Sequence, residues 1–230
     1  MTGCLLLEGG AEFGGQMSIP DRRAIELAGG IDVPICIIPT AAAPDHNHVH
    51  AGHTGVRWFK RLGATNVKSL PLIDKSSAED PEIAAALLAT KLVYILGGFP
   101  GYLGKTLKFS RAWESVLEAH QNGTVVAGSS AGAMVLCQFY YDPQTNEVID
   151  GLNLIRNVCV LPHHNTFGGT WASYLLSQLP GVTLLGIDEQ TGVLDDGHGE
   201  YWSVLGRGAA TLYQGGSVET YRAGKSFSIQ

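Results

Sequence analysis

The sequence predicts an α/β fold: a three-layer sandwich in which helices cover both faces of a mainly parallel central sheet, with short antiparallel strands near the C-terminus. Short apolar segments bounded by Gly or Pro alternate with longer amphipathic segments along most of the 230 residues, which is the order of βαβ units. The apolar segments are nearly uninterrupted, as expected for strands buried on both faces. No internal repeat or low-complexity linker divides the chain, so we expect a single domain over residues 1–230.

The individual elements follow from local composition. Strands are expected where short runs rich in leucine or β-branched residues stand between Gly or Pro, at 3–9, 33–39, 91–96, 124–128, 157–162 and 182–188. Amphipathic patterns predict helices at about 21–29, 49–62, 79–89, 110–121, 131–138 and 170–178. Asp80 followed by Pro81 is typical of a helix start. Beyond residue 190, glycine-rich turns separate four segments that we expect to form antiparallel strands at the sheet edge: GVLDDG, EYWSVLG, AATLYQ and SVETYR.

Composition excludes several classes of protein. Lys and Arg number 15 against 21 Asp and Glu, and the net charge of −6 argues against a nucleic-acid binder. The hydrophobic content of 45% excludes a disordered chain. The first residues, MTGCLLLEGG, lack the basic start of a signal peptide, and the apolar run VPICIIPTAAAP is too short to span a bilayer. The four cysteines have no CxxC spacing, so we expect buried free thiols and a cytoplasmic protein.

The segment TVVAGSSAGAMVL at 124–136 carries the clearest chemical signal. It places the motif G-x-S-x-G between an apolar strand and a helical run, with Ser130 at its centre. A serine on such a tight strand-to-helix turn is typical of a nucleophile elbow, and small neighbours are needed because the turn is cramped. The backbone N–H of Ala131 is then a candidate oxyanion donor.

A nucleophilic serine needs a base, and the base needs an orienting acid. His163 and His164 directly follow the strand 157–162, and Asp188 and Glu189 follow the strand 182–188 in the same way. Ends of parallel strands that share one edge of a sheet are where α/β sites assemble. The order along the chain is serine, histidine, acid, which differs from the order of the α/β-hydrolases. The residues themselves leave both histidines and both acids open.

Other glycine-rich and histidine-rich segments are weaker candidates for sites. The turn after the strand 91–96 offers Gly98 or Phe99 as a second oxyanion donor. The same turn fails as a P-loop, because Phe99 stands where the motif needs glycine, and GGAEFGG lacks the spacing of a dinucleotide fingerprint. Four histidines lie in the run DHNHVHAGH, from His46 to His53. Their spacing suits zinc or nickel, but a solvated helix start is the favoured interpretation, with substrate contact as an alternative.

These motifs together resemble one family. GSSAGAM, the preceding LGG loop, PTAAAP, PHH and GIDEQTGVL followed by VLGRGAATLY are similar, in the same order, to the cyanophycinase and peptidase E group of serine peptidases. The resemblance implies a class I glutamine-amidotransferase-like sandwich and a Ser–His–Glu triad that works without a metal. It maps the nucleophile to Ser130, the base to His163 and the acid to Glu189, and it suggests a homodimer. No cofactor is expected.

The resemblance predicts a serine peptidase that cleaves a peptide or isopeptide bond of a small peptide through an acyl-enzyme, either cyanophycinase-like or aspartyl-dipeptidase-like. The sequence departs from that pattern at Phe99-Pro100, where the family usually has polar residues, and the segment after His163 lacks the usual arginines. We therefore expect an apolar pocket around Phe99, Phe167 and Trp171, with His164 and Asn165 also contacting substrate. The alternative function is a non-catalytic ligand-binding protein on the same scaffold.

Overall fold

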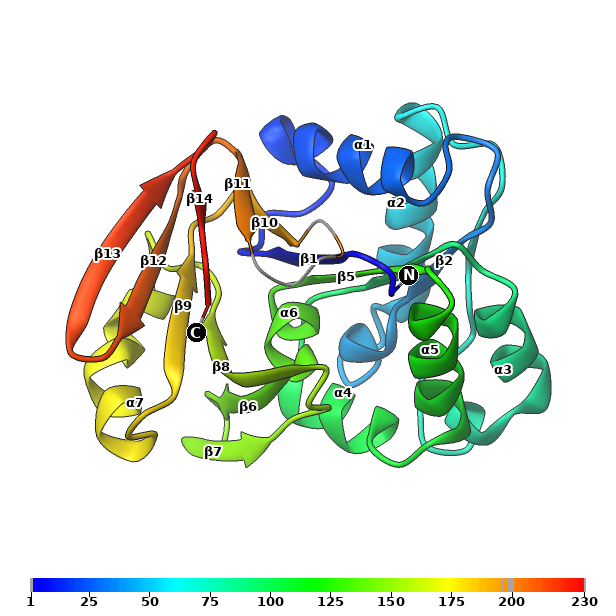
Figure 1. Cartoon of the computed structure of the whole chain (residues 1–230). Coiled ribbons are helices and arrows are strands. Elements are labelled where there is room, and N and C mark those ends of the chain that lie inside the picture. The colour runs from blue at the N-terminus through cyan, green and yellow to red at the C-terminus, as the bar shows by residue number, and fades with distance from the viewer. Residues whose placement is uncertain (1, 196, 198–200, 230) are drawn as a thin grey trace.

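The computed structural model describes residues 2–195, 197 and 201–229, and among these residues the chain forms two sheets with helices around them (Figure 1). The larger sheet has eight described strands in the order β14-β11-β10-β1-β5-β4-β2-β3. Its parallel strands are β1 (Leu5–Glu8), β2 (Ile35–Ile38), β3 (Val67–Ser69), β4 (Leu92–Ile95) and β5 (Val125–Ser129). Its antiparallel side is formed by β10 (Thr191–Asp195), β11 (Trp202–Gly206) and β14 (Ser226–Phe227).

The second sheet has six described strands in the order β13-β12-β9-β8-β6-β7. They are β6 (Cys137–Asp142), β7 (Glu147–Asp150), β8 (Ile155–Leu161), β9 (Thr183–Ile187), β12 (Ala209–Gln214) and β13 (Ser217–Arg222). Its three middle strands, β6, β8 and β9, are parallel, and its outer strands are antiparallel. Figure 1 shows this sheet standing to one side of the larger one, with α7 (Ala172–Gln178) on its outer face.

The helices lie on both faces of the larger sheet, except for α7, which lies against the second sheet (Figure 1). They are α1 (Ser18–Leu27), α2 (His48–Arg61), α3 (Pro81–Leu88), α4 (Pro100–Leu107), α5 (Arg111–Gln121), α6 (Ala131–Leu136) and α7 (Ala172–Gln178). Leu6 packs with α1 and α2 in one apolar cluster, whereas Leu5 and Leu7 belong to a second cluster that also takes in α3 to α6 and the second sheet. Successive side chains of a strand point to opposite faces, so both faces of β1 are covered by apolar residues.

The predicted fold class is confirmed, and the main difference from it is the second sheet. The segments 157–162 and 182–188 form strands, as do AATLYQ and SVETYR, but they pair in this separate sheet and not at the edge of the central one. The predicted helix 131–138 ends at Leu136, because β6 begins at Cys137. The strands β3, β6 and β7 and the helix α4 had no counterpart in the sequence patterns.

Several local predictions can be compared directly with the described residues. Asp80 caps α3 by accepting a hydrogen bond from the Glu82 N–H at 2.7 Å, and all four cysteines are buried free thiols. GVLDDG and EYWSVLG correspond to β10 and β11, although residues 196 and 200 of these segments lie outside the described residues. Within the described ranges, no helix has both the length and the apolar character needed to cross a membrane.

Candidate active site

Ser130 occupies a sharp turn between β5 and α6. Its backbone angles are φ 49° and ψ −113°, a region that non-glycine residues rarely adopt, and its N–H donates to the Glu8 carbonyl at 3.0 Å. The glycines of the motif allow this packing. A Cβ on Gly132 would lie 2.2 Å from the Ile95 carbonyl oxygen, and one on Gly128 would lie 2.6 Å from the backbone of Gly132. The G-x-S-x-G spacing therefore reflects close approach of the backbone on both sides of Ser130.

His163 lies next to this serine. It follows β8 after one proline, and its Nε2 is 3.0 Å from Ser130 Oγ. The His163 N–H donates to the Gly9 carbonyl at 2.7 Å, so the loop after β1 fixes the backbone of the histidine. The neighbouring Gly10 leaves room for the ring, because a Cβ there would lie 2.2 Å from His163 Cε1.

Glu189 completes a chain of hydrogen-bonded side chains. Its Oε1 lies 2.8 Å from His163 Nδ1, and its backbone N–H donates to Asn165 Oδ1 at 2.9 Å. The following residue, Gln190, donates its N–H to the Gly10 carbonyl at 3.1 Å. Asn165, which we expected to contact substrate, thus holds the backbone of Glu189.

The alternative histidine and acid pair elsewhere. His164 Nε2 lies 2.8 Å from the Tyr213 hydroxyl, and its Nδ1 lies 3.6 Å from Asp188 Oδ1. Asp188 also accepts the Ala209 N–H through Oδ2 at 2.9 Å. The geometry therefore favours His163 and Glu189 as the partners of Ser130, and it gives no support to His164 as a substrate contact.

The two candidate oxyanion donors on the loop after β4 are the backbone N–H groups of Gly98 and Phe99, and they differ in their hydrogen-bond acceptors. The Phe99 N–H already donates to the Ala41 carbonyl at 2.9 Å. Within the described part of the chain, the Gly98 N–H makes no recorded bond to a backbone carbonyl. A Cβ on Gly98 would lie 2.3 Å from the Ala41 oxygen, and its φ of 138° also requires glycine. The geometry favours Gly98 over Phe99 as the partner of the Ala131 N–H.

Aromatic rings border the histidine. Phe167 stacks on the His163 ring with centroids 4.8 Å apart and planes inclined by 22°, and its side chain is 51% exposed. Trp171 contacts Phe167 edge to face at 5.6 Å and Tyr141 at 5.1 Å. Two of the three residues expected around an apolar pocket, Phe167 and Trp171, are thus in contact, whereas Phe99 belongs to the separate loop after β4.

Glu12 was missed by the sequence analysis. It belongs to GGAEFGG, whose glycine spacing says nothing about the acid. In the structure, Glu12 Oε2 accepts a hydrogen bond from the Ser129 hydroxyl at 3.2 Å. A Cβ on Gly97 would lie 3.0 Å from Glu12 Oε1 and 3.0 Å from Ser130 Cβ. The available signal was its place shortly after β1, at the strand end next to that of β5.

A buried pair of acidic residues lies near this loop, with Glu8 at the end of β1 and Asp21 in α1. Glu8 and Asp21 are both 0% exposed, and the Tyr94 hydroxyl donates to Glu8 while Trp58 Nε1 donates to Asp21 at 2.7 Å. Burial, followed by the charge of Asp21, raises the pKa of Glu8 well above its usual value. Burial raises the pKa of Asp21 to about 7. At neutral pH the pair therefore retains at least part of its protons.

The His46–His53 run forms no metal centre. α2 begins at His48, and His46 precedes it with a φ of 60°. Among the described residues, no group of three or more His, Cys, Asp or Glu side chains is arranged to hold a metal ion. The helix-start interpretation of this run agrees with the structure.

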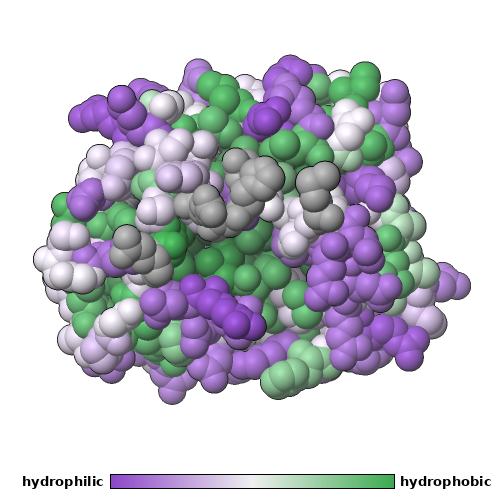
Figure 2. Space-filling model, viewed as in Figure 1, coloured by the Kyte–Doolittle hydropathy of each residue, from purple (hydrophilic) through white to green (hydrophobic). Residues whose placement is uncertain are grey.

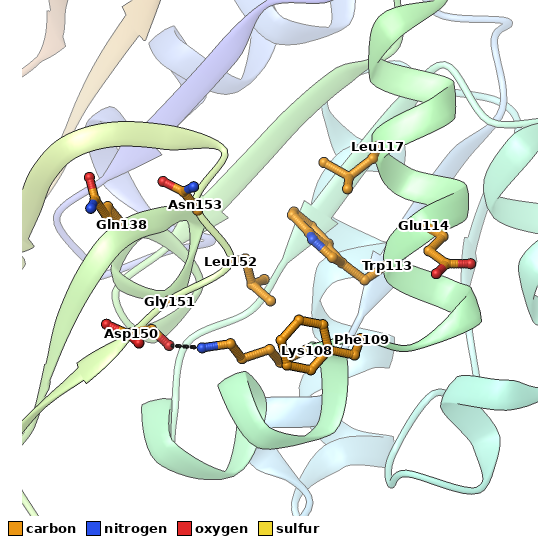
Figure 3. A pocket seen from close by; sticks show the side chains of 10 residues that line it. All are labelled: Lys108, Phe109, Trp113, Glu114, Leu117, Gln138, Asp150, Gly151, Leu152 and Asn153. Carbon is orange, nitrogen blue, oxygen red and sulfur yellow. Dashed lines mark hydrogen bonds between the residues drawn. The ribbon is translucent and has the colours of Figure 1, made fainter.

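A separate pocket of about 530 Å³ lies between α5 and the β6–β7 region. Figure 3 shows Trp113 and Leu117 of α5 on one side and Leu152 across from them, with Lys108 Nζ donating to the Asp150 carbonyl at 3.0 Å. Figure 2, which has the same view as Figure 1, shows apolar surface near the middle of the visible face, bordered by hydrophilic residues. None of Ser130, His163 and Glu189 lines the pocket, so we do not assign it to the candidate active site.

Comparison with known proteins places the chain among peptidases. Residues 5–200 match peptidase family S51. The cyanophycinase of Geminocystis herdmanii is 28% identical over 215 residues, covering 89% of this chain and 78% of that protein. The cyanophycinase of Trichormus variabilis is 28% identical over 202 residues, covering 83% of this chain and 66% of that protein.

Solved structures give the same result. The crystal structure of a peptidase from an acI-B1 Actinobacterium is 31% identical, with a TM-score of 0.89 over 100% of this chain and 98% of that one. A putative peptidase E protein from Listeria monocytogenes shares the fold at 19% identity, with a TM-score of 0.63 over 96% of this chain and 99% of that one. The family resemblance predicted from the motifs is confirmed. The chain belongs to peptidase family S51, and it is a serine peptidase.

Proposed function

We propose that this peptidase hydrolyses a peptide or isopeptide bond of a small peptide through Ser130 as nucleophile, His163 as general base and Glu189 as the orienting acid. The observation that carries the proposal is the continuous hydrogen-bonded chain from Ser130 Oγ through both His163 nitrogens to Glu189 Oε1, at 3.0 and 2.8 Å. Nucleophile, base and acid in this order are the arrangement that activates a serine hydroxyl.

The proposed reaction has two halves. His163 Nε2 takes the hydroxyl proton of Ser130 as Oγ attacks the scissile carbonyl carbon, and the same nitrogen then gives the proton to the leaving amine as the C–N bond breaks. The acyl-enzyme that remains is attacked by water, with His163 again accepting and returning a proton. Glu189 keeps the Nδ1–H of His163 pointing toward itself and stabilises the imidazolium that forms in each half.

Two backbone N–H groups are suited to the negative charge of the tetrahedral intermediate. We assign this role to Ala131, which follows the nucleophile, and to Gly98, whose N–H has no recorded backbone acceptor among the described residues. Removing one such donor from a serine peptidase typically costs about 10²–10³ in kcat. Gly98 needs its glycine for the turn itself, so its donor is better tested by structure with a bound inhibitor than by substitution.

The surroundings of His163 favour an apolar or aromatic substrate side chain. Phe167 is half exposed beside the His163 ring, and Trp171 extends this apolar surface. The segment NTFGGTWASYLL that supplies both residues contains no arginine, and the Glu12 carboxylate lies close to Ser130. An aspartyl side chain would meet no cation from this segment, and we therefore propose that specificity has moved away from aspartyl substrates.

The test is cleavage of a mixed panel of α-aspartyl, β-aspartyl and apolar dipeptides, followed by mass spectrometry and compared with Ser130→Ala. We expect serine-dependent cleavage that is fastest for the apolar members. Faster cleavage of aspartyl dipeptides would contradict the proposed specificity but leave the mechanism standing. Absence of cleavage throughout would favour a non-catalytic binding protein on this scaffold. The homodimer that the resemblance suggests stays a prediction, and light scattering during size-exclusion chromatography would check it.

A further inference from the structure

Glu12 places a carboxylate beside the nucleophile. Its Oε1 and Ser130 Cβ both lie 3.0 Å from the point that a Cβ on Gly97 would occupy, so these two atoms are within about 6 Å of each other. Only glycine at position 97 leaves this space open, because any side chain would begin between the carboxylate and the serine. A substrate held at Ser130 is therefore within reach of Glu12.

The carboxylate has no cationic partner within the described part of the chain. The ion pairs recorded there are Arg23–Glu26, His163–Glu189 and His164–Asp188. The Ser129 hydroxyl donates to Oε2 of Glu12, and this leaves Oε1 with acceptor capacity on the side of Ser130. Glu12 is half-buried, so a ligand arriving from solvent can reach it.

The charge of the Glu12 carboxylate acts on the groups around it. Burial is the main cause that raises the pKa of both Glu8 and Asp21, and the charge of Glu12 raises both further. A carboxylate so near Ser130 also opposes the negative charge that develops on the substrate oxygen during attack. A bound cation would remove this opposition, because it would neutralise Glu12 at the moment when the oxyanion forms.

We propose that Glu12 binds the free α-ammonium group of the substrate, so that the enzyme cleaves the peptide bond after an N-terminal residue. This inference rests on the proposed function of Ser130. In such a peptide the ammonium nitrogen is two covalent bonds, about 2.5 Å, from the scissile carbonyl carbon. A carbonyl about 3–3.5 Å from Ser130 Oγ and an ammonium about 2.8 Å from Glu12 Oε1 fit the span between these two side chains. A bond inside a longer chain offers only a neutral amide at that place.

The experiment compares two substrates that differ only in this charge. The dipeptide of the panel that the wild-type enzyme cleaves fastest is assayed beside its N-acetyl derivative. We expect the kcat/KM of wild type to be about 30-fold or more higher for the free dipeptide than for the N-acetyl form. Removing one partner of a buried charged pair typically has an effect of at least this size. Glu12→Gln should lose about the same factor on the free dipeptide and cleave the N-acetyl form at least as fast as wild type does, because glutamine carries no charge that opposes the oxyanion. Glu12→Asp keeps the charge and should restore part of the preference.

Ser129→Ala is the matched control. It removes the hydrogen bond to Glu12 but leaves the carboxylate in place, so the preference for the free dipeptide should stay much closer to that of wild type than in Glu12→Gln. The inference is overturned if wild type cleaves both substrates alike, or if Glu12→Gln slows both equally, since Glu12 would then only brace the turn.

Labelling by a fluorophosphonate separates this inference from the proposed function, because that reagent needs an activated serine but carries no ammonium group. Labelling of Ser130 is expected in wild type, and Glu12→Gln should be labelled at least as fast because it lacks the opposing charge. Labelling without cleavage of any free dipeptide would overturn the inference and keep Ser130 as nucleophile. Absence of both labelling and cleavage would refute the proposed function and the inference together.

Discussion

Ser130 Oγ lies 3.0 Å from His163 Nε2 while the Ser130 backbone is held at φ 49° and ψ −113°. The side chain that reaches the proposed base thus stands on a backbone conformation that is unfavourable for any residue with a Cβ. A strained position of this kind lowers the stability of the fold while it orients a functional side chain. The loss of stability and the contribution to catalysis can be measured separately.

Two substitutions of Ser130 separate the catalytic role of its side chain from the strain in its backbone. Ser130→Ala should lower kcat/KM on the order of 10⁴-fold or more and leave the unfolding free energy nearly unchanged, because alanine keeps the Cβ. Ser130→Gly should be equally inactive but about 1 kcal/mol more stable than Ser130→Ala, since glycine relieves the strain. Peptide hydrolysis and urea unfolding measure the two effects. Equal stability of the two variants would mean that the turn carries no strain.

The acid can be identified by a matched pair of amide variants. Glu189→Gln should lower kcat by about 10²–10⁴, because the glutamine amide does not hold the imidazole in the required tautomer or stabilise its cation. Asp188→Asn should have a much smaller effect, because Asp188 bonds Ala209 and lies near His164 instead. Steady-state kinetics of both variants would show the difference, and the reverse ranking would transfer the role to Asp188.

Gly10 offers a test of the space around the base. A Cβ at this position, where φ is 106°, would lie 2.2 Å from His163 Cε1, whereas Gly14 has no heavy atom within 4 Å of its Cβ position. Gly10→Ala should lower kcat by about 100-fold through displacement of the ring. Gly14→Ala is the control and should stay within about twofold of wild type. Similar losses in both would point to the loop as a whole.

The pair Glu8 and Asp21 predicts how stability depends on pH. Both carboxyls have raised pKa values in the folded state, with burial as the main cause, and that of Asp21 is about 7. A carboxyl that is harder to ionise when folded favours the folded state at low pH. This contribution is complete below the ordinary pKa of 3.8 for Asp and is lost as the pH rises through about 7.

Urea unfolding at a series of pH values between 4 and 8 would measure this dependence. We expect the contribution of the pair to decrease across this range, so that Asp21→Asn, which cannot ionise, shows a flatter profile than wild type. Asp32→Asn, at an exposed position, is the control and should follow the wild-type curve. Identical profiles for wild type and Asp21→Asn would contradict the prediction.

The sequence contained most of what positions the candidate triad. G-x-S-x-G after an apolar strand located Ser130, and polar residues at two later strand ends located His163 and Glu189. These signals are local, since each depends only on a strand and the residue that follows it. The resemblance to a family was needed to choose between His163 and His164, because the two are adjacent and only the fold shows which one faces Ser130.

Other features depended on contacts between distant segments. The Phe99 N–H is used by Ala41, 58 positions earlier in the chain, and nothing in the local sequence reveals this. β6 was missed because the aromatic run after Leu136 follows directly on a short helix, without the Gly or Pro that bounded the predicted strands. Glu12 was missed because a single acid in a glycine-rich loop has no periodic pattern.

Three successive carbonyls give the site a common origin. The oxygens of Glu8, Gly9 and Gly10 accept the N–H groups of Ser130, His163 and Gln190, at 3.0, 2.7 and 3.1 Å. Ser130 follows a strand of the larger sheet, whereas His163 and Glu189 follow strands of the second sheet. The backbone at the end of β1 therefore sets the relative positions of residues that come from two different sheets. Lengthening the chain by one residue after Glu8 would shift the base and the acid together while the nucleophile stayed in place.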